Sequence, residues 1–222
     1  YLWVDPLKNL IDYFSVIKSA TPAIQNLYLG DYIFTKSTPW HYDIIWILFT
    51  SPLTIVILFI IGFLLQSIHI FKNFMNVEKK DHKFWYNKKE LIDFYIFLAF
   101  TLIFFMRLKF GVNYDGWRQI YFLYPLIIIL GLYGLEYLKR IINNTIIIKF
   151  LFIIVFLELI FLSIWNYKNH PYQFVYFNPI FKSLTKNNFE LDYWGISNRS
   201  VLEQIFHINE KNDFRVTTIS YT

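Results

Sequence analysis

The chain of 222 residues contains no cysteine, so it forms no disulfide and offers no thiolate to a metal or a substrate. Glycine and proline number seven each, which excludes a collagen-like or low-complexity chain. Alanine occurs only at Ala20, Ala23 and Ala99, although closely packed membrane helices usually rely on small residues. The sequence also lacks a glycine-rich phosphate-binding loop, residues spaced like the ligands of a metal ion, and a repeat of fixed period. We therefore expect no metal and no cofactor.

Apolar side chains dominate the composition. Hydrophobic residues make up 56% and aromatic residues 22% of the chain, and the mean hydropathy is +0.38, values typical of membrane proteins. We expect an all-α polytopic membrane protein with about four transmembrane helices, interfacial helices and the start of a small α/β extracytoplasmic tail. The chain begins at Tyr1 without signal-peptide features and ends at Thr222 within an expected strand. We therefore expect a fragment, internal or C-terminal, of a longer protein.

Residues 1–43 contain no spanning segment and are expected to form an extracytoplasmic or interfacial loop. After Asp5-Pro6, apolar residues recur every three or four positions, which predicts an amphipathic helix in the membrane interface. A helix packed on a soluble domain is the alternative. The apolar residues are Leu7, Leu10, Ile11, Phe14 and Ile17. Thr21-Pro22 is expected to start a second short helix that Gly30 ends.

Residues 44–165 are expected to form the transmembrane helix bundle. No Asp, Glu, Lys or Arg lies between Asp43 and Lys72, and this uncharged stretch is long enough to cross a bilayer. Pro52 lies within this first span and is expected to kink it. Hydropathy predicts further spans near 91–108, 120–138 and 146–165.

The distribution of basic residues predicts the orientation. Six lysines lie between Lys72 and Glu90, which places this loop in the cytoplasm. We interpret it as a solvated loop rather than a nucleic-acid or lipid-specific site, and we expect no nucleic-acid partner. Four spans then place residues 1–43, the loop 107–118 and the tail on the opposite face. The expected location is the bacterial inner membrane, with the working face extracytoplasmic.

Two glutamates fall within the predicted spans. Glu136 precedes Lys139 and Arg140 by three and four residues, which predicts local ion pairing at the cytoplasmic end. Glu158 lies deeper, where an unpaired, unhydrated carboxylate is costly. It is expected to face the bundle interior or the outer interface, and a structural role and a site role both stay open.

Residues 166–222 have the mixed composition of a soluble segment and are expected to form a truncated extracytoplasmic tail. Ser200 and Glu203 have the spacing of a capping box, which predicts a short helix with Ser200 at its start. Residues 214–221 alternate between apolar and polar side chains and predict a strand.

Two polar-aromatic clusters lie at the predicted outer ends of spans, one at residues 38–43 and the other at residues 115–118. Tryptophan and tyrosine are ordinary anchors at this depth, but the anchor interpretation leaves His41, Asp115 and Arg118 unexplained. An arginine suits a phosphate because its planar guanidinium makes bidentate, charge-assisted hydrogen bonds. It can also stabilise charge on a leaving phosphate, with Lys109 as a second positive charge. His41 is either a proton carrier or ligand, or a structural residue.

These clusters resemble a known family. Thr38-Pro39-Trp40-His41-Tyr42, followed by Trp46 and Thr50-Ser51-Pro52-Leu53, resembles the "PW-Y-Y … W … TP" segment of bacterial membrane glycosyltransferases. That group belongs to the C-type superfamily and is related to dolichyl-phosphate-mannose protein mannosyltransferases and the lipid A aminoarabinose transferase, as in glycosyltransferase family 39. Residues 114–125 are similar to the Arg-aromatic-Tyr-Pro start of a later helix in this group, and residues 170–178 and 189–195 resemble the start of its external tail. The resemblance covers most of the chain.

The resemblance implies transfer of a sugar from a polyprenyl-phosphate carrier to an acceptor glycan, lipid or protein on the extracytoplasmic face. Arg118 is expected to contact the lipid-linked phosphate with support from Lys109. The residues expected to line the carrier or sugar entrance are Trp40, His41, Tyr42, Tyr114, Asp115 and Trp117. The family's catalytic base is an acidic residue of the first external loop, which has no counterpart in this sequence. We therefore assign no catalytic residue, expect the base upstream, and expect the fragment alone to be inactive.

Two other functions stay open. The first is a non-enzymatic polytopic protein, such as a transporter, flippase or assembly subunit. A transporter should hold paired ionisable groups near the middle of the membrane, and only Glu158 comes close to that position. The second is a membrane anchor for a protein-binding tail, which predicts that the residues after Trp165 retain binding when separated from the spans.

Overall fold

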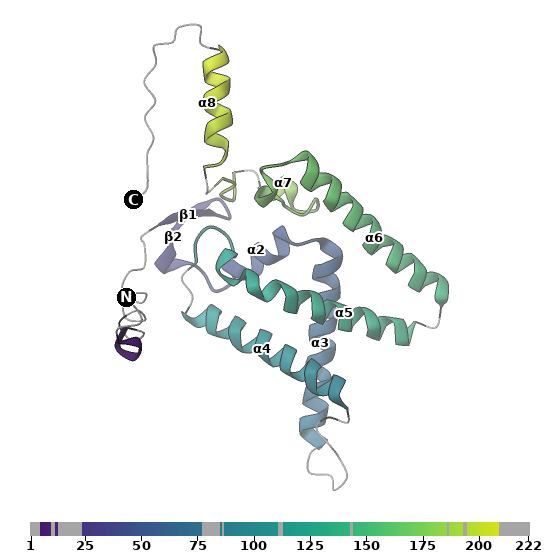
Figure 1. The fold of residues 1–222 in the computed structure, drawn as a ribbon. Coiled ribbons are helices and arrows are strands. Elements are labelled where there is room, and N and C mark those ends of the chain that lie inside the picture. Colours follow the sequence, from purple (N-terminus) through teal and green to yellow (C-terminus); the bar gives the residue numbers. More distant parts are fainter. Residues whose placement is uncertain are drawn as a thin grey trace.

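In the computed structural model of this chain, the described residues are 5–9, 12, 24–76, 85, 87–110, 113–142, 144–185, 187–192 and 195–208. They form a mostly helical molecule with one two-stranded sheet (Figure 1). The elements are β1 (Gln25–Tyr28), β2 (Asp31–Phe34), η1 (Thr35–Ser37), α2 (Tyr42–Thr50), α3 (Leu53–Asn76), α4 (Lys88–Phe110), η2 (Arg118–Leu123), α5 (Tyr124–Ile141), α6 (Thr145–Lys168), η3 (Gln173–Val175), α7 (Lys182–Thr185) and α8 (Ser197–Ile208).

Among the described residues, four segments are long and apolar enough to cross a membrane, which agrees with the predicted number of spans. They are Leu53–Asn76, Lys88–Lys109, Arg118–Ile141 and Thr145–Lys168. The predicted local pairing of Glu136 is also confirmed for Arg140, whose Nη2 lies 2.7 Å from Glu136 Oε1. Lys89 of α4 forms a second ion pair with the same carboxylate.

Helices α3 and α5 cross at very close range (Figure 1). A Cβ atom built on Gly62 would lie 1.8 Å from the carbonyl oxygen of Leu130, and one built on Gly134 would lie 2.6 Å from that of Leu58. Only glycine allows two helix backbones to approach this closely. Two glycines at one crossing therefore provide the close packing that the scarcity of alanine would otherwise limit.

The predicted first span is divided into two helices, because α2 ends at Thr50 and α3 begins at Leu53. Ser51 between them is extended (φ −96°, ψ 150°), the conformation favoured before a proline. Pro52 therefore breaks the helix instead of kinking it, and the span starts at Leu53 instead of at residue 44.

Glu158 of α6 occupies the start of α3. Its carboxylate accepts hydrogen bonds from the backbone N–H groups of Leu53 (2.9 Å) and Thr54 (3.1 Å) and from the Thr54 hydroxyl. The first N–H groups of a helix have no partner within the helix, and the partial positive charge there favours an anion. Glu158 is thus a cap supplied by a neighbouring helix, which is the structural role left open above.

The residues before α2 form a β-hairpin rather than the predicted second helix. Leu29 and Gly30 have φ values of 53° and 93°, and two consecutive positive φ angles are typical of a tight hairpin turn. Along β1 the side chains of Asn26 and Tyr28 are buried while Gln25 is exposed, the alternation of a half-buried strand. Gly30 therefore lies in a turn and does not end a helix.

Helix α8 begins at Ser197, so the predicted cap at Ser200 is wrong. The Asp192 carboxylate accepts hydrogen bonds from the N–H groups of Ile196 (3.0 Å) and Ser197 (2.8 Å) and so fixes an earlier start. The Ser200 hydroxyl instead lies 2.5 Å from Tyr172 Oη.

Three predicted segments fall wholly or partly outside the described residues. Of the amphipathic helix expected after Asp5, residues 6–9 and 12 are described and helical. Residues 77–84 and 86 of the lysine-rich loop and the strand expected at 214–221 are not described.

An aromatic core joins the hairpin, α2 and the segment after α6 at one end of the bundle. Trp46 of α2 packs edge-to-face on Phe189, with ring centroids 5.0 Å apart. Phe49 stacks on Phe181 at 4.2 Å. The backbone N–H of Asn178 donates to the carbonyl of Phe49 (2.7 Å). This core supports the loop that carries the second predicted cluster.

Candidate functional site

The loop that joins α4 to η2 is held by hydrogen bonds from two other elements. Asp115 and Gly116 have φ values of 52° and 72°, so the chain turns sharply at this point. The Asn26 side-chain oxygen accepts a hydrogen bond from the Asp115 N–H (3.2 Å), and Tyr42 Oη accepts one from the Gly116 N–H (3.2 Å). The fold thereby joins the two predicted clusters, although 74 residues separate Tyr42 from Gly116.

Arg118 lies with two of the other predicted site residues at the start of η2. Its Nη2 is 2.7 Å from Asp115 Oδ2, and the side chains of Arg118 and Asp115 are 25% and 15% exposed. The guanidinium carbon lies 4.9 Å from the centroid of the Tyr114 ring, within the range of a cation–π interaction. Burial raises the pKa of the Asp115 carboxyl, and the charge of Arg118 opposes that rise. The cation is therefore fixed in place at the edge of the protein.

Trp117 is buried and belongs to the support of the loop. Its indole N–H donates to Thr50 Oγ1 (2.8 Å) on α2, and its ring meets Tyr121 edge-to-face at 4.5 Å. Only 4% of Trp117 is exposed. The side chain positions the loop, and its small accessible part lines both the groove at the start of the third span and the narrow space beside Asp115.

The three aromatic residues of the first cluster lie in different environments. Tyr42 is buried in the aromatic core, His41 is half-buried with Nδ1 2.7 Å from Tyr28 Oη, and Trp40 is exposed. This arrangement gives Tyr42 and His41 structural contacts and leaves Trp40 on the surface. Lys109 lies exposed near the end of α4.

A buried ion pair, which the sequence analysis did not identify, lies next to this loop. Arg107 Nε on α4 donates to Asp43 Oδ2 (3.0 Å) on α2, and Asp43 is fully buried. Arg107 also donates to the side-chain oxygen of Gln119 (3.2 Å), whose amide donates to the Tyr114 carbonyl (2.9 Å). Burial raises the pKa of Asp43, and Arg107 opposes that rise. In the sequence, only the opposite charges of Asp43 and Arg107 at the same predicted membrane depth indicated this pair.

Glu190 is a second carboxyl group close to Asp115. Its backbone N–H donates to the Leu27 carbonyl of β1 (3.2 Å), which fixes the segment beside the hairpin. Burial raises the pKa of Glu190, and the negative charge of Asp115 raises it further. Both carboxyl groups line a narrow space of about 10 Å³ together with Thr50 and Trp117.

This narrow space shares lining residues with two larger ones. An open groove of about 470 Å³ is lined by residues that include Thr50, Tyr121, Tyr124 and Pro125 at the start of the third span. A cavity of about 670 Å³ shares Phe177 with the narrow space. Asp115 and Glu190 thus lie next to both the groove and an aromatic cavity in the tail.

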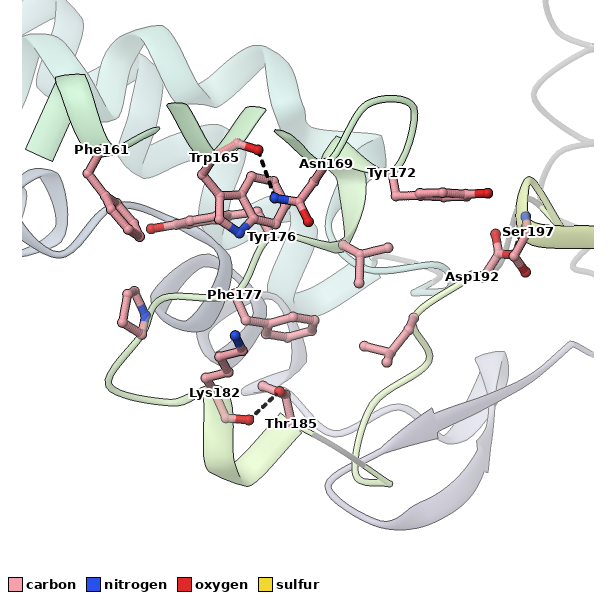
Figure 2. Close-up of a pocket in the computed structure, with 13 residues that line it drawn as sticks. Phe161, Trp165, Asn169, Tyr172, Tyr176, Phe177, Lys182, Thr185, Asp192 and Ser197 are labelled. Carbon is pink, nitrogen blue, oxygen red and sulfur yellow. Dashed lines mark hydrogen bonds between the residues drawn. The ribbon is translucent and has the colours of Figure 1, made fainter. Parts of the chain in front are cut away.

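Figure 2 shows the aromatic cavity between the end of α6 and the segment that follows it. Phe161 and Trp165 come from α6, and Tyr172, Tyr176 and Phe177 come from the chain beyond it. Lys182 and Asp192 are the charged groups of its lining. Burial raises the pKa of the Asp192 carboxyl, but hydrogen bonds from the Ser197 hydroxyl and from the N–H groups of residues 195–197 outweigh it and lower the pKa.

Among the described residues, no group of three or more His, Cys, Asp or Glu side chains is arranged to hold a metal ion. No protein-family model, curated protein or solved structure matches the chain. The resemblance to membrane glycosyltransferases therefore rests on the motifs quoted above.

Proposed function

We propose that the chain is part of an integral-membrane glycosyltransferase that moves a sugar from a polyprenyl-phosphate carrier to an acceptor glycan, lipid or protein. The reaction takes place on the extracytoplasmic face, and the location is the bacterial inner membrane. The observation that carries the proposal is Arg118, which is held by Asp115 and the Tyr114 ring at one end of a spanning segment.

The chemistry of Arg118 fits the phosphate of a lipid-linked sugar. A guanidinium stays ionised and has five N–H donors in one plane, the geometry that suits the oxygens of a phosphate. When the sugar–oxygen bond breaks, negative charge develops on the departing phosphate, and a fixed cation next to it lowers the barrier. Asp115 acts as a positioning residue that holds the guanidinium in place.

The groove next to the loop fits the lipid part of the carrier. It is lined by Tyr121, Tyr124 and Pro125 of the third span and meets the narrow space that Asp115 lines. A polyprenyl chain lying along these side chains would bring its phosphate to the loop from the membrane side.

We do not favour the transporter alternative. It depended on Glu158 as an ionisable group inside the bundle, and the hydrogen bonds of that carboxylate to Leu53 and Thr54 give it a structural task.

The test is sugar transfer by the full-length protein with Arg118→Ala and Arg118→Lys. Because each charge-assisted hydrogen bond is worth about 1.5–3 kcal/mol, we expect kcat/KM for the lipid donor to fall by roughly 10- to 100-fold in Arg118→Ala and by less in Arg118→Lys. Arg199→Ala is the matched control, since Arg199 is an exposed, ion-paired arginine of α8. If Arg118→Ala transfers sugar at the wild-type rate, Arg118 does not contact the phosphate.

A further inference from the structure

The buried ion pair of Asp43 and Arg107 joins the ends of two helices beside the loop 113–118. Asp43 lies in the first turn of α2, where the partial positive charge of a helix start favours an anion, and Arg107 lies in the last turn of α4. Their side chains are 1% and 12% exposed, so water and salt screen the pair little. Because a buried charge without its partner is costly, Asp43 fixes the position of the Arg107 guanidinium.

Arg107 binds a second acceptor with the same guanidinium. Its Nε donates to Asp43 Oδ2 (3.0 Å), and its Nη2 donates to Gln119 Oε1 (3.2 Å) on η2. The rigid fork of an arginine makes two such bonds at once, whereas the ammonium of a lysine is a compact point charge on a flexible stem. Arg107 therefore links the start of α2 and the end of α4 to the start of the third span.

The Gln119 amide has one orientation that satisfies both of its neighbours. Its oxygen accepts from Arg107, and its nitrogen donates to the carbonyl of Tyr114 (2.9 Å). A guanidinium only donates and a carbonyl only accepts, so a flipped amide would lose both hydrogen bonds. Arg107 thus determines that the N–H groups of Gln119 face Tyr114.

Tyr114 connects this network to the guanidinium of Arg118. The hydrogen bond from Gln119 fixes the Tyr114 carbonyl, and the backbone sets the direction in which the ring leaves the chain. That ring lies 4.9 Å from the guanidinium carbon of Arg118. Arg118 and Gln119 are also consecutive residues of η2, so the same contacts hold the turn from which Arg118 projects.

We propose that Arg107 is a positioning residue for Arg118, which acts through Gln119 and Tyr114 and does not touch the substrate. This role rests on the proposed function, since it requires that Arg118 binds the phosphate of the lipid carrier. It makes phosphate recognition depend on a buried ion pair between two other helices.

The test compares the binding of farnesyl phosphate and farnesol to the full-length protein in the same detergent micelles, measured by isothermal titration calorimetry. The two probes differ only in the phosphate group, so the ratio of their Kd values isolates its recognition. We expect the wild type to prefer farnesyl phosphate by about tenfold or more. Arg118→Ala should lose that preference, because it lacks the charge-assisted hydrogen bonds to the phosphate.

Gln119→Met and Arg107→Lys each interrupt the network at one residue. Each should lower the preference by roughly three- to tenfold, the effect of one lost hydrogen bond, while the Kd for farnesol stays unchanged. The double variant should lose no more than the larger single loss, because both residues act through the same Tyr114 carbonyl. Gln204→Met is the matched control at an exposed position of α8 and should keep the wild-type preference.

The outcomes separate this role from the proposed function. Equal binding of the two probes by the wild type, or a full preference in Arg118→Ala, overturns both. A preference that is lost in Arg118→Ala but kept in Gln119→Met and Arg107→Lys overturns the positioning role alone.

A merely structural role gives a different result. Weaker binding of farnesol and farnesyl phosphate by the same factor, or losses that add in the double variant, would also overturn the positioning role. If Arg107→Lys fails to fold, Gln119→Met decides the question, because it leaves the ion pair of Asp43 and Arg107 in place.

Discussion

The crossing of α3 and α5 predicts a large difference between two chemically identical substitutions. In Gly62→Ala, the new methyl group would lie 1.8 Å from the Leu130 carbonyl oxygen, whereas ordinary contact begins near 3.4 Å. The obstacle is backbone and cannot rotate away, so the two helices must separate. Gly131→Ala, on α5 at the same interface, meets its nearest atom at 3.4 Å, the backbone nitrogen of Phe59.

Overpacking a close contact costs about 1–3 kcal/mol, and we expect Gly62→Ala to lower the free energy of unfolding by about 3 kcal/mol because the neighbour is rigid. Gly131→Ala should lie between no change and a gain of about 1 kcal/mol, since alanine is the better helix former. The measurement is denaturant unfolding of both variants in the same mixed micelles. Equal stability of Gly62→Ala and the wild type, or equal losses in the two variants, would refute the described crossing.

Two further predictions concern carboxyl groups. Glu158→Ala should lower the free energy of unfolding by about 2 kcal/mol or more, because it leaves the Leu53 and Thr54 N–H groups without their acceptor. Glu158→Gln keeps one acceptor oxygen and should lower the free energy of unfolding by about half as much. The same unfolding measurement tests this. The raised pKa of Glu190 means that the folded state holds the proton more tightly than the unfolded chain. The resulting stabilisation is full below the ordinary pKa of 4.5 and is lost as the pH rises through the higher folded-state value. Glu190→Gln should therefore flatten the fall in stability over that pH range, as seen in unfolding curves at successive pH values.

Contradictory results for these carboxyl groups are equally specific. An unfolding free energy of Glu158→Ala within about 0.5 kcal/mol of wild type would exclude the cap. Glu203 is an exposed carboxyl group of α8. If Glu203→Gln changes the pH dependence of the unfolding free energy as much as Glu190→Gln does, burial of Glu190 is not the cause of that dependence.

The spanning helices were predictable because hydropathy and length alone determine them. The uncharged run after Asp43 identified a span in the right region, but its start depended on Pro52, whose effect on a helix ranges from a kink to a complete break. The break occurs here because Glu158, more than 100 residues further along, supplies the acceptor for the new helix start. No local pattern carries that information.

The hairpin and the buried ion pair were missed for similar reasons. Leu29 at positive φ is uncommon, so the turn lacked the usual Asn-Gly or Gly-Gly signal. Asp43 and Arg107 are 64 residues apart, and each alone looked like a charge at the end of a span. Of the candidate site, the sequence indicated that the two clusters share one membrane face. The separate environments of Trp40 and Tyr42 depend on the hairpin and became clear only from the structure.

The hydrogen bonds that hold the loop 113–118 run from side chains to backbone groups. Asn26 binds the backbone of Asp115, Tyr42 binds that of Gly116, and Gln119 binds that of Tyr114. A backbone partner is present whatever its own side chain is. In related chains, Asn26, Tyr42 and Gln119 should therefore vary little. Gly116, whose φ of 72° favours glycine, and the pair of Asp115 and Arg118 should vary little too, while exchange of the other loop side chains can change ligand specificity on an unchanged loop shape. Paired substitutions between these positions should be rare, and the contacts would leave little trace in correlated sequence variation.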